Sequence, residues 1–279
     1  MKKSKLVLLI PAACLLCSCG NSEPGSDFKE IKKEDVPAKA KAIDSKVGGD
    51  SFEVPTKLTF TQSATASGEA QEEMGGAKGD QKVIIDTENK YFYASCGGTF
   101  ASALEKDTTN LEFWAYQDDA SLVLATAFGE TKAYTKIGST AISEAYNSFC
   151  ENFSLDLDSI KDTVKAMVEE ISYLVAAVSI DVSVSTPSAS GSIEAKFYSK
   201  GDGDLKVTAK TSASKSEDSY TAEVTYVIAD YLPAYTYSKA SGKMSGADFS
   251  IEEKSLYEWN KADTSSKPNL KDFTETSEL

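Results

Sequence analysis

The chain has 279 residues, of which 41% are hydrophobic, and a formal net charge of −14 at pH 7. It contains no histidine, and all 29 basic residues are lysines because the sequence holds no arginine. Histidine is the usual general base and the commonest metal ligand, and arginine is the bidentate donor to phosphates and carboxylates, so the commonest catalytic and phosphate-binding sites are excluded. The acidic excess also disfavours binding to nucleic acid.

The first 18 residues have the three-part organisation of a secretory signal peptide. A basic head of three lysines precedes an apolar run over residues 6–16, and the small residue Ser18 stands directly before Cys19. The apolar run is about half as long as the roughly 20 residues of a membrane-spanning helix. We therefore do not expect this run to persist as a membrane anchor.

The residues Leu16-Cys17-Ser18-Cys19 resemble the lipobox of bacterial lipoproteins, which places an aliphatic residue three positions before the lipidated cysteine and a small residue just before it. The resemblance implies cleavage before Cys19, attachment of acyl chains such as palmitate to this residue, and a location on the extracytoplasmic face of the plasma or outer membrane. Two or more acyl chains hold a protein stably on a bilayer. Cleavage would change the net charge from −14 to −17, because residues 1–18 contain three lysines and no acidic residue. An ordinary secretory signal peptide is the alternative.

Cys96 and Cys150 are the cysteines that remain besides Cys19 after such a cleavage. Outside the cytoplasm they can form a disulfide, which would stabilise the fold by roughly 4 kcal/mol in the loop-entropy model. Two unpaired buried thiols are the equally weighted alternative. We predict neither a zinc site nor another cofactor, because no histidine and no further cysteine can complete four ligands.

The segments at the two ends of the mature chain are poor in core-forming residues. Residues 19–55 are polar and contain three of the seven prolines, so we predict a flexible tether with a short helix near residues 38–46. Residues 261–279 are predicted to be a loose tail. The region between them, residues 56–260, is long enough for a single domain with a sizeable core.

The first half of this domain alternates apolar and polar residues, a pattern that predicts antiparallel strands with one buried face. Strands are expected at residues 58–66, twice within 81–95 around the turn formers at 86–89, twice within 111–128 around 118–121, and at 131–137.

The spacing of apolar residues then becomes helical. Ile142, Tyr146, Phe149 and Phe153 predict one amphipathic helix, and apolar residues at gaps of three and four from Ile160 to Val178 predict a second. Strands are expected again at residues 180–184, 193–197, 205–209, 220–228, 235–237, 249–251 and 256–259.

Roughly nine to eleven strands with two central helices predict an α+β fold, in which a curved, half-barrel-like antiparallel sheet holds the helices across its concave face. In order and pattern, residues 40–260 resemble the half-barrel lipoproteins of the Lol carrier and LppX type, where acyl chains bind between sheet and helices. The resemblance implies a non-catalytic protein that binds a lipid-like or other apolar ligand. The arginine latch of the Lol carrier has no counterpart here. A structural or interaction protein, such as an adhesin or a subunit of an envelope complex, is the alternative.

The candidate ligand-lining residues are Met167, Ile171, Leu174 and Val175, which share one side of the second predicted helix. Tyrosine, phenylalanine and tryptophan residues crowd both groups of strands, and one set of these rings is expected to complete an apolar cavity. Ordinary core packing is the alternative explanation for the aromatic residues.

Three short motifs have a chemical and a structural interpretation. The sequence S-A-S-K at residues 212–215 matches the S-x-x-K of serine acyl enzymes, but acidic neighbours would keep its lysine protonated, so a polar hairpin turn is expected. The D-G-D at 202–204 and the D-L-D at 156–158 offer carboxylates to Ca²⁺, which needs six to eight oxygen ligands. A turn and a helix cap explain these two motifs better, and we predict neither catalysis nor a metal site.

Overall fold

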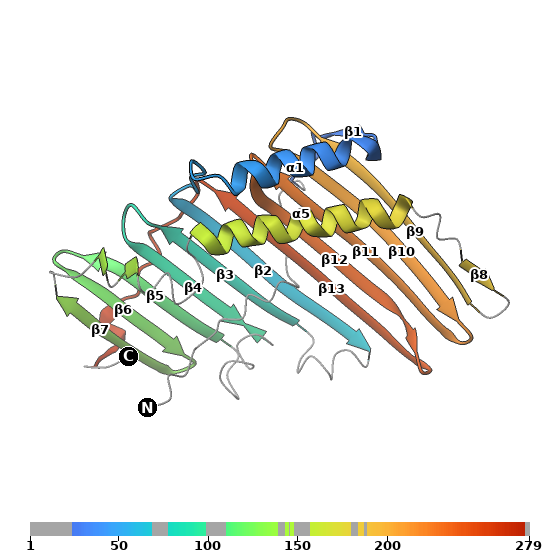
Figure 1. Ribbon diagram of the computed structural model, residues 1–279. Helices are drawn as coiled ribbons and strands as arrows, with labels where there is room; N and C mark the ends of the chain where they lie inside the picture. The colour runs from blue at the N-terminus through green and yellow to red at the C-terminus, as the bar shows by residue number, and fades with distance from the viewer. Residues whose placement is uncertain are drawn as a thin grey trace, which may run out of the picture.

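The computed structural model describes residues 24–68, 78–98, 110–138, 143–144, 146–147, 157–179, 184–186 and 189–276. In this part of the chain, a large, curved and unclosed β-sheet carries two long helices on one face (Figure 1). The fold is therefore broadly α+β, as the sequence predicts. The sheet has fourteen strands in the described residues, which is more than the nine to eleven expected.

The strands form two meanders that lie side by side. The first consists of β2 (Lys57–Gly68), β3 (Lys78–Asp86), β4 (Tyr91–Gly97), β5 (Asn110–Asp118), β6 (Ser121–Phe128) and β7 (Thr131–Gly138). The second consists of β9 (Ala189–Ser199), β10 (Leu205–Lys215), β11 (Asp218–Ala229), β12 (Leu232–Met244) and β13 (Ala247–Trp259). Antiparallel pairing of the last strand, β13, with β2 joins the two meanders into one sheet.

Three short strands complete the sheet at its edges. Strands β1 (Lys29–Ile31) and β8 (Val184–Thr186) both pair with β9, and β14 (Thr274–Glu275) pairs in parallel with β7. The two hairpin turns predicted near residues 86–89 and 118–121 are present, and Lys90 and Asp119 have positive φ there. The S-A-S-K motif lies inside β10 rather than in a turn, and the expected strands at 249–251 and 256–259 are one continuous strand, β13.

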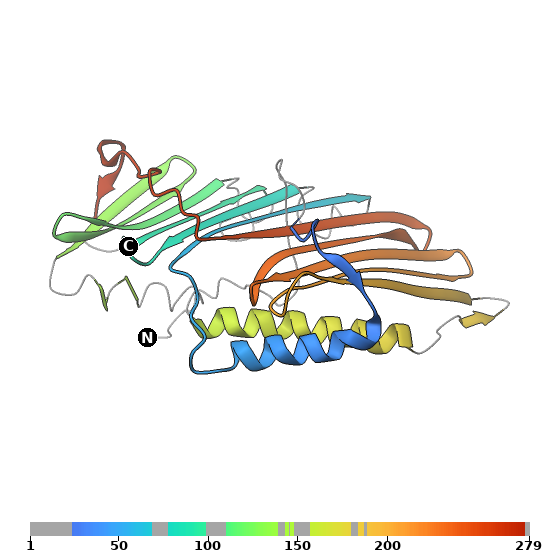
Figure 2. The ribbon, with the colours of Figure 1, turned by 90° about the horizontal axis from the view of Figure 1, so that it is seen from above.

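The two long helices are α1 (Val36–Val47) and α5 (Leu157–Ser179), and they lie side by side against the strands of the second meander (Figures 1 and 2). Helix α5 confirms the second predicted helix. Of the first predicted helix, only residues 143–144 and 146–147 are described, and they are helical. The helix that packs beside α5 therefore comes from the N-terminal segment and not from the middle of the chain.

The prediction of a flexible tether up to residue 55 was wrong for residues 29–55. Val36, Ile43 and Val47 are fully buried, and β1 is part of the sheet. The apolar residues of α1 recur at gaps of four and three, so they form a stripe that packs against α5 and the sheet. The short helix expected near residues 38–46 is confirmed within α1.

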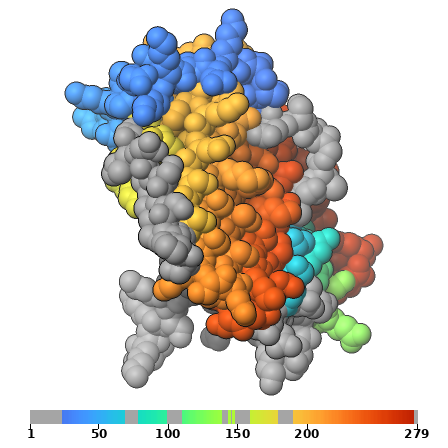
Figure 3. All heavy atoms as spheres, turned by 90° about the vertical axis from the view of Figure 1, so that its right-hand side faces the viewer, coloured from blue at the N-terminus to red at the C-terminus, as the bar shows by residue number. Residues whose placement is uncertain are grey.

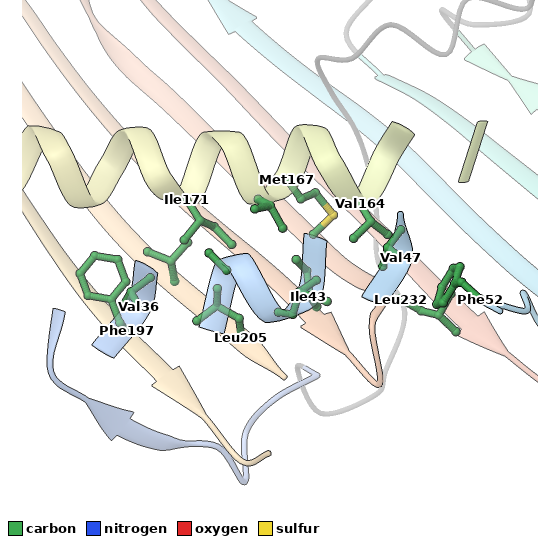
Figure 4. Packing of buried hydrophobic residues seen from close by; sticks show 14 residues of the cluster. Val36, Ile43, Val47, Phe52, Val164, Met167, Ile171, Phe197, Leu205 and Leu232 are labelled. Atoms are coloured by element: carbon green, nitrogen blue, oxygen red, sulfur yellow. The ribbon is translucent and has the colours of Figure 1, made fainter. Parts of the chain in front are cut away.

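The main core lies between the two helices and the sheet (Figure 4). Its helical residues include Ile43, Val164, Met167 and Ile171, and its strand residues include Phe197, Leu205 and Leu232. Fully burying an aliphatic side chain of this size stabilises a fold by about 1.5–3 kcal/mol. This packing is what fixes the helices on the sheet.

Side chains from outside the first meander pack on both of its faces. On the face shared with the helices, the Tyr146 side chain is buried and its hydroxyl donates to the Tyr91 carbonyl oxygen at 2.8 Å. On the opposite face, the C-terminal segment packs Leu270 and Phe273, near the short helix η2 (Leu270–Asp272), against aromatic side chains. The prediction of a loose tail was therefore wrong for residues 261–276.

Candidate functional site: an open groove at the sheet edge

An open groove of about 670 Å³ lies at the edge of the sheet where β1 of the N-terminal segment pairs with β9. Figure 3 faces this edge, with the N-terminal segment in blue above the yellow and orange strands. The groove is bounded by β1 and the short helix η1 (Lys33–Asp35), by the end of α5, and by β9.

The floor of the groove is apolar. Ile31, Val178 and Ala195 line it and also pack against the main core, and Phe197 beneath them is buried. At the groove, the apolar packing between the helices and the sheet therefore reaches the surface. An apolar ligand seated here would extend the hydrophobic core outward.

The rim of the groove carries charges of both signs. Lys32, Lys33 and Lys196 line it together with Glu30 and Glu34. Between residues that the structure describes, no ion pair engages any of these three lysines. The ammonium groups of Lys32 and Lys33 can therefore meet an anionic or polar head group while the apolar floor takes a hydrocarbon chain. Lys196 alternates along β9 with the core-facing residues Ala195 and Phe197, so its side chain points to the opposite face of the sheet.

Sequence reasoning missed this groove because its walls come from three distant segments. The sequence predicts a tether for residues 30–34, the end of a helix at Val178 and an ordinary strand for residues 195–197. The lysines near residue 32 give no signal by themselves, since charged runs are usually solvated surface.

The four candidate ligand-lining residues lie together on α5, but none of them lines the groove. Met167 and Ile171 are buried in the core against α1, as Figure 4 shows, and Leu174 and Val175 are half-buried against the same core. Their part in ligand binding stays a prediction, and their place in the structure is that of core residues.

The predicted cysteine sites are described only in part. Cys96 carries a free, buried thiol beside Leu111, and burial raises the pKa of this thiol to about 11, which makes it a poor nucleophile at neutral pH. Cys150 and Cys19 lie outside the described residues. The disulfide and the lipid attachment therefore remain predictions.

The remaining motifs have structural contacts. The Ser212 and Ser214 hydroxyls each lie 2.8 Å from a serine hydroxyl of β9, and these pairs are exposed on the sheet. In the D-G-D turn, a carboxylate oxygen of Asp204 accepts the Asp230 backbone N–H at 2.9 Å. The described residues contain no group of three or more potential metal ligands, and Asp156 of the D-L-D motif lies outside them.

The sheet face opposite the helices carries exposed ion pairs over the second meander, beside a buried apolar cluster of Val227, Ala234 and Tyr235 against which Phe28 packs. Lys210 and Glu223 form an ion pair across β10 and β11, and Lys239 and Glu252 form one across β12 and β13. Exposed pairs of this kind contribute about 1 kcal/mol or less, so their main effect is to keep a single-layer sheet solvated.

Comparisons of the chain with protein-family models, with curated proteins and with solved structures find no match. Among the helices that the structure describes, none has the length and apolar character needed to cross a membrane.

Proposed function

We propose that the protein is a lipid-anchored, extracytoplasmic lipoprotein that binds a lipid-like or other apolar ligand without catalysis. The observation that carries the binding proposal is the open groove, whose apolar floor is continuous with the core between helices and sheet. The proposal of an anchor is supported by the signal-peptide pattern and by the lipobox that ends at Cys19.

The dimensions and lining of the groove suit an amphiphile. Its volume of about 670 Å³ lies within the range of roughly 300–1,000 Å³ for small-molecule sites. Each methylene buried on Ile31, Val178 and Ala195 would contribute about 0.8 kcal/mol, and the rim lysines of the N-terminal segment would interact with a negative head group. We interpret the curved sheet and its two helices as a half-barrel-like support for this site.

A structural or interaction protein is the second candidate. It is favoured by the close packing of Met167 and Ile171 in the core and by the exposed lysine–glutamate pairs on the opposite face of the second meander. We do not propose an enzyme, because the Ser212 hydroxyl contacts another hydroxyl and the chain has no histidine to activate it.

The anchor is tested by replacing Cys19 with serine in the native host. We expect metabolic labelling with an alkyne fatty acid to mark the wild-type protein and the Cys17→Ser control but not Cys19→Ser. The wild type should also partition into detergent, whereas Cys19→Ser should not. Equal labelling of both variants would contradict the assignment of Cys19.

The groove is tested by titrating the soluble protein with a fluorescent single-chain fatty acid. Val178→Trp places a large ring at the groove, whereas Tyr173→Trp changes a residue of the same helix that is 73% exposed. We expect Val178→Trp to weaken binding at least tenfold and Tyr173→Trp to leave it unchanged. No saturable binding to the wild type, or equal binding to both variants, would contradict the proposed site.

A further inference from the structure

An aromatic surface lies on the sheet face opposite the helices, over the first meander. It consists of Tyr91, Tyr93, Trp114, Tyr116 and Tyr134, which come from strands β4, β5 and β7. The C-terminal strap, residues 261–276, crosses this surface, and Figure 2 shows it on the side away from α1 and α5.

The centre of the strap is held by contacts to its backbone and to one cation. The Ser266 carbonyl oxygen accepts two hydrogen bonds, from Trp114 Nε1 at 2.9 Å and from the Tyr91 hydroxyl at 3.1 Å. The next residue, Lys267, places its ammonium group 4.9 Å from the centre of the Tyr116 ring. A cation over a tyrosine ring contributes about 0.5–1 kcal/mol at exposed sites.

The end of the strap is held by a ring and by a short strand. Phe273 meets Trp114 edge to face with ring centres 6.0 Å apart. Strand β14 then pairs with β7, and the Thr276 backbone N–H donates to the Tyr134 carbonyl oxygen at 2.8 Å.

Burial is unequal on the two sides of this contact. Tyr91, Trp114 and Tyr116 are only 1%, 7% and 4% exposed, whereas none of residues 261–276 is buried. The strap therefore covers the surface without entering the core. Segments with few buried contacts open at a smaller free-energy cost than global unfolding.

The contacts match the way in which proteins bind extended peptides. Aromatic surfaces that recognise such peptides use ring donors to backbone carbonyls and pockets for neighbouring side chains, and a proline reduces the entropy lost by the peptide. The strap presents the accepting carbonyl at Ser266, a lysine at 267 and a proline at 268. The strap therefore contacts the aromatic surface as a bound peptide would, although it belongs to the same chain.

We propose that the aromatic surface is a peptide-docking site, filled by the strap of the same molecule and able to accept the strap of a second copy. The change of chain direction at Asn260, where φ is +60°, separates the strap from β13 and provides the point of exchange. A strap from a second copy would make the same contacts, which is the condition for exchange of a terminal segment between protomers. Because the strap is attached to the molecule that carries the surface, its effective concentration there is in the millimolar range. Exchange with the strap of a second copy is therefore favoured where copies are crowded.

Cleavage of the full chain tests whether the strap behaves as a ligand. A protease site placed after the exposed residue Lys261 allows the strap to be cut from the folded protein, and a labelled synthetic peptide of residues 262–279 is then titrated by fluorescence anisotropy. We expect the cut protein to keep its circular dichroism spectrum and to bind the peptide saturably. Trp114→Phe, which removes the N–H donor but keeps a ring, should weaken binding at least fivefold.

Trp259→Phe is the matched control, because Trp259 Nε1 also donates to a backbone carbonyl, that of Pro233 at 2.7 Å, but away from the aromatic surface. It should bind the peptide like the wild type.

In a separate experiment, uncut chains of natural isotope composition and uncut isotopically heavy chains are mixed at high concentration and treated with an amine cross-linker. Cross-links between Lys271 and Lys132, which lies over Phe273, should include mixed-isotope pairs. Unfolding on cleavage, failure of the peptide to bind, or cross-links of a single isotope only would overturn the proposal.

Discussion

Replacement of Ile43 by alanine measures how much helix α1 contributes to the fold. Ile43 has no exposed surface and packs in the core with Met167 and Ile171. Truncating a buried isoleucine to alanine costs about 2–5 kcal/mol, because it removes apolar contacts and leaves a cavity. Since proteins of this kind are stable by about 5–15 kcal/mol, the loss is a large part of the total.

Urea unfolding followed by circular dichroism measures this loss as a lower midpoint at an unchanged slope. Ser45→Ala is the control on the same helix, because Ser45 is exposed and should change the free energy of unfolding by no more than about 0.5 kcal/mol. If Ile43→Ala behaved like this control, α1 would not be part of the core, and the packing of the N-terminal segment would be refuted.

Three further changes probe separate parts of the structure. Because burial raises the pKa of the Cys96 thiol to about 11 from its ordinary value near 9, the unfolded chain ionises first as the pH rises, so stability is complete below pH 9. Under reducing conditions, wild type should lose on the order of 2 kcal/mol more between pH 9 and 11 than Cys96→Ala; equal pH profiles would contradict this. Gly242→Ala would place a methyl group 1.9 Å from the Ser219 carbonyl oxygen and should cost about 1–3 kcal/mol in thermal unfolding, whereas Gly138→Ala, which meets open space, should cost clearly less. Tyr146→Phe removes the 2.8 Å hydrogen bond to Tyr91 and should cost about 1 kcal/mol in urea unfolding, and an unchanged midpoint would argue against this buried bond.

Local patterns in the sequence predict the local elements correctly. The alternation around residues 86–89 and 118–121 predicts two hairpins, and the helical spacing from Ile160 to Val178 predicts α5. These signals work because a strand or helix with one buried face must repeat its apolar residues at a fixed period. The pairing of β13 with β2 has no such signal, since it joins segments almost 200 residues apart in the sequence.

The packing of the N-terminal helix and of the C-terminal strap is not predicted by the sequence, for a different reason. The apolar stripe of α1 is present in the sequence at residues 36, 40, 43 and 47, but prolines and charged residues around it made the segment look like a linker. The strap contributes Ala262, Leu270 and Phe273 to its contacts and is otherwise held through its backbone, which composition does not reveal. The groove combines residues of the N-terminal segment, the end of α5 and β9, so no local pattern in the sequence predicts it.

Native mass spectrometry tests the proposed function most directly. Residues 22–279 would be purified from the native host without detergent, and any bound molecule would be released by organic extraction and identified. We predict a stoichiometric apolar or lipid-like ligand on the wild type and on Tyr173→Trp, and its loss from Val178→Trp. A mass equal to that of the protein alone, unchanged after incubation with membrane lipids, would contradict ligand binding and favour a structural or interaction role.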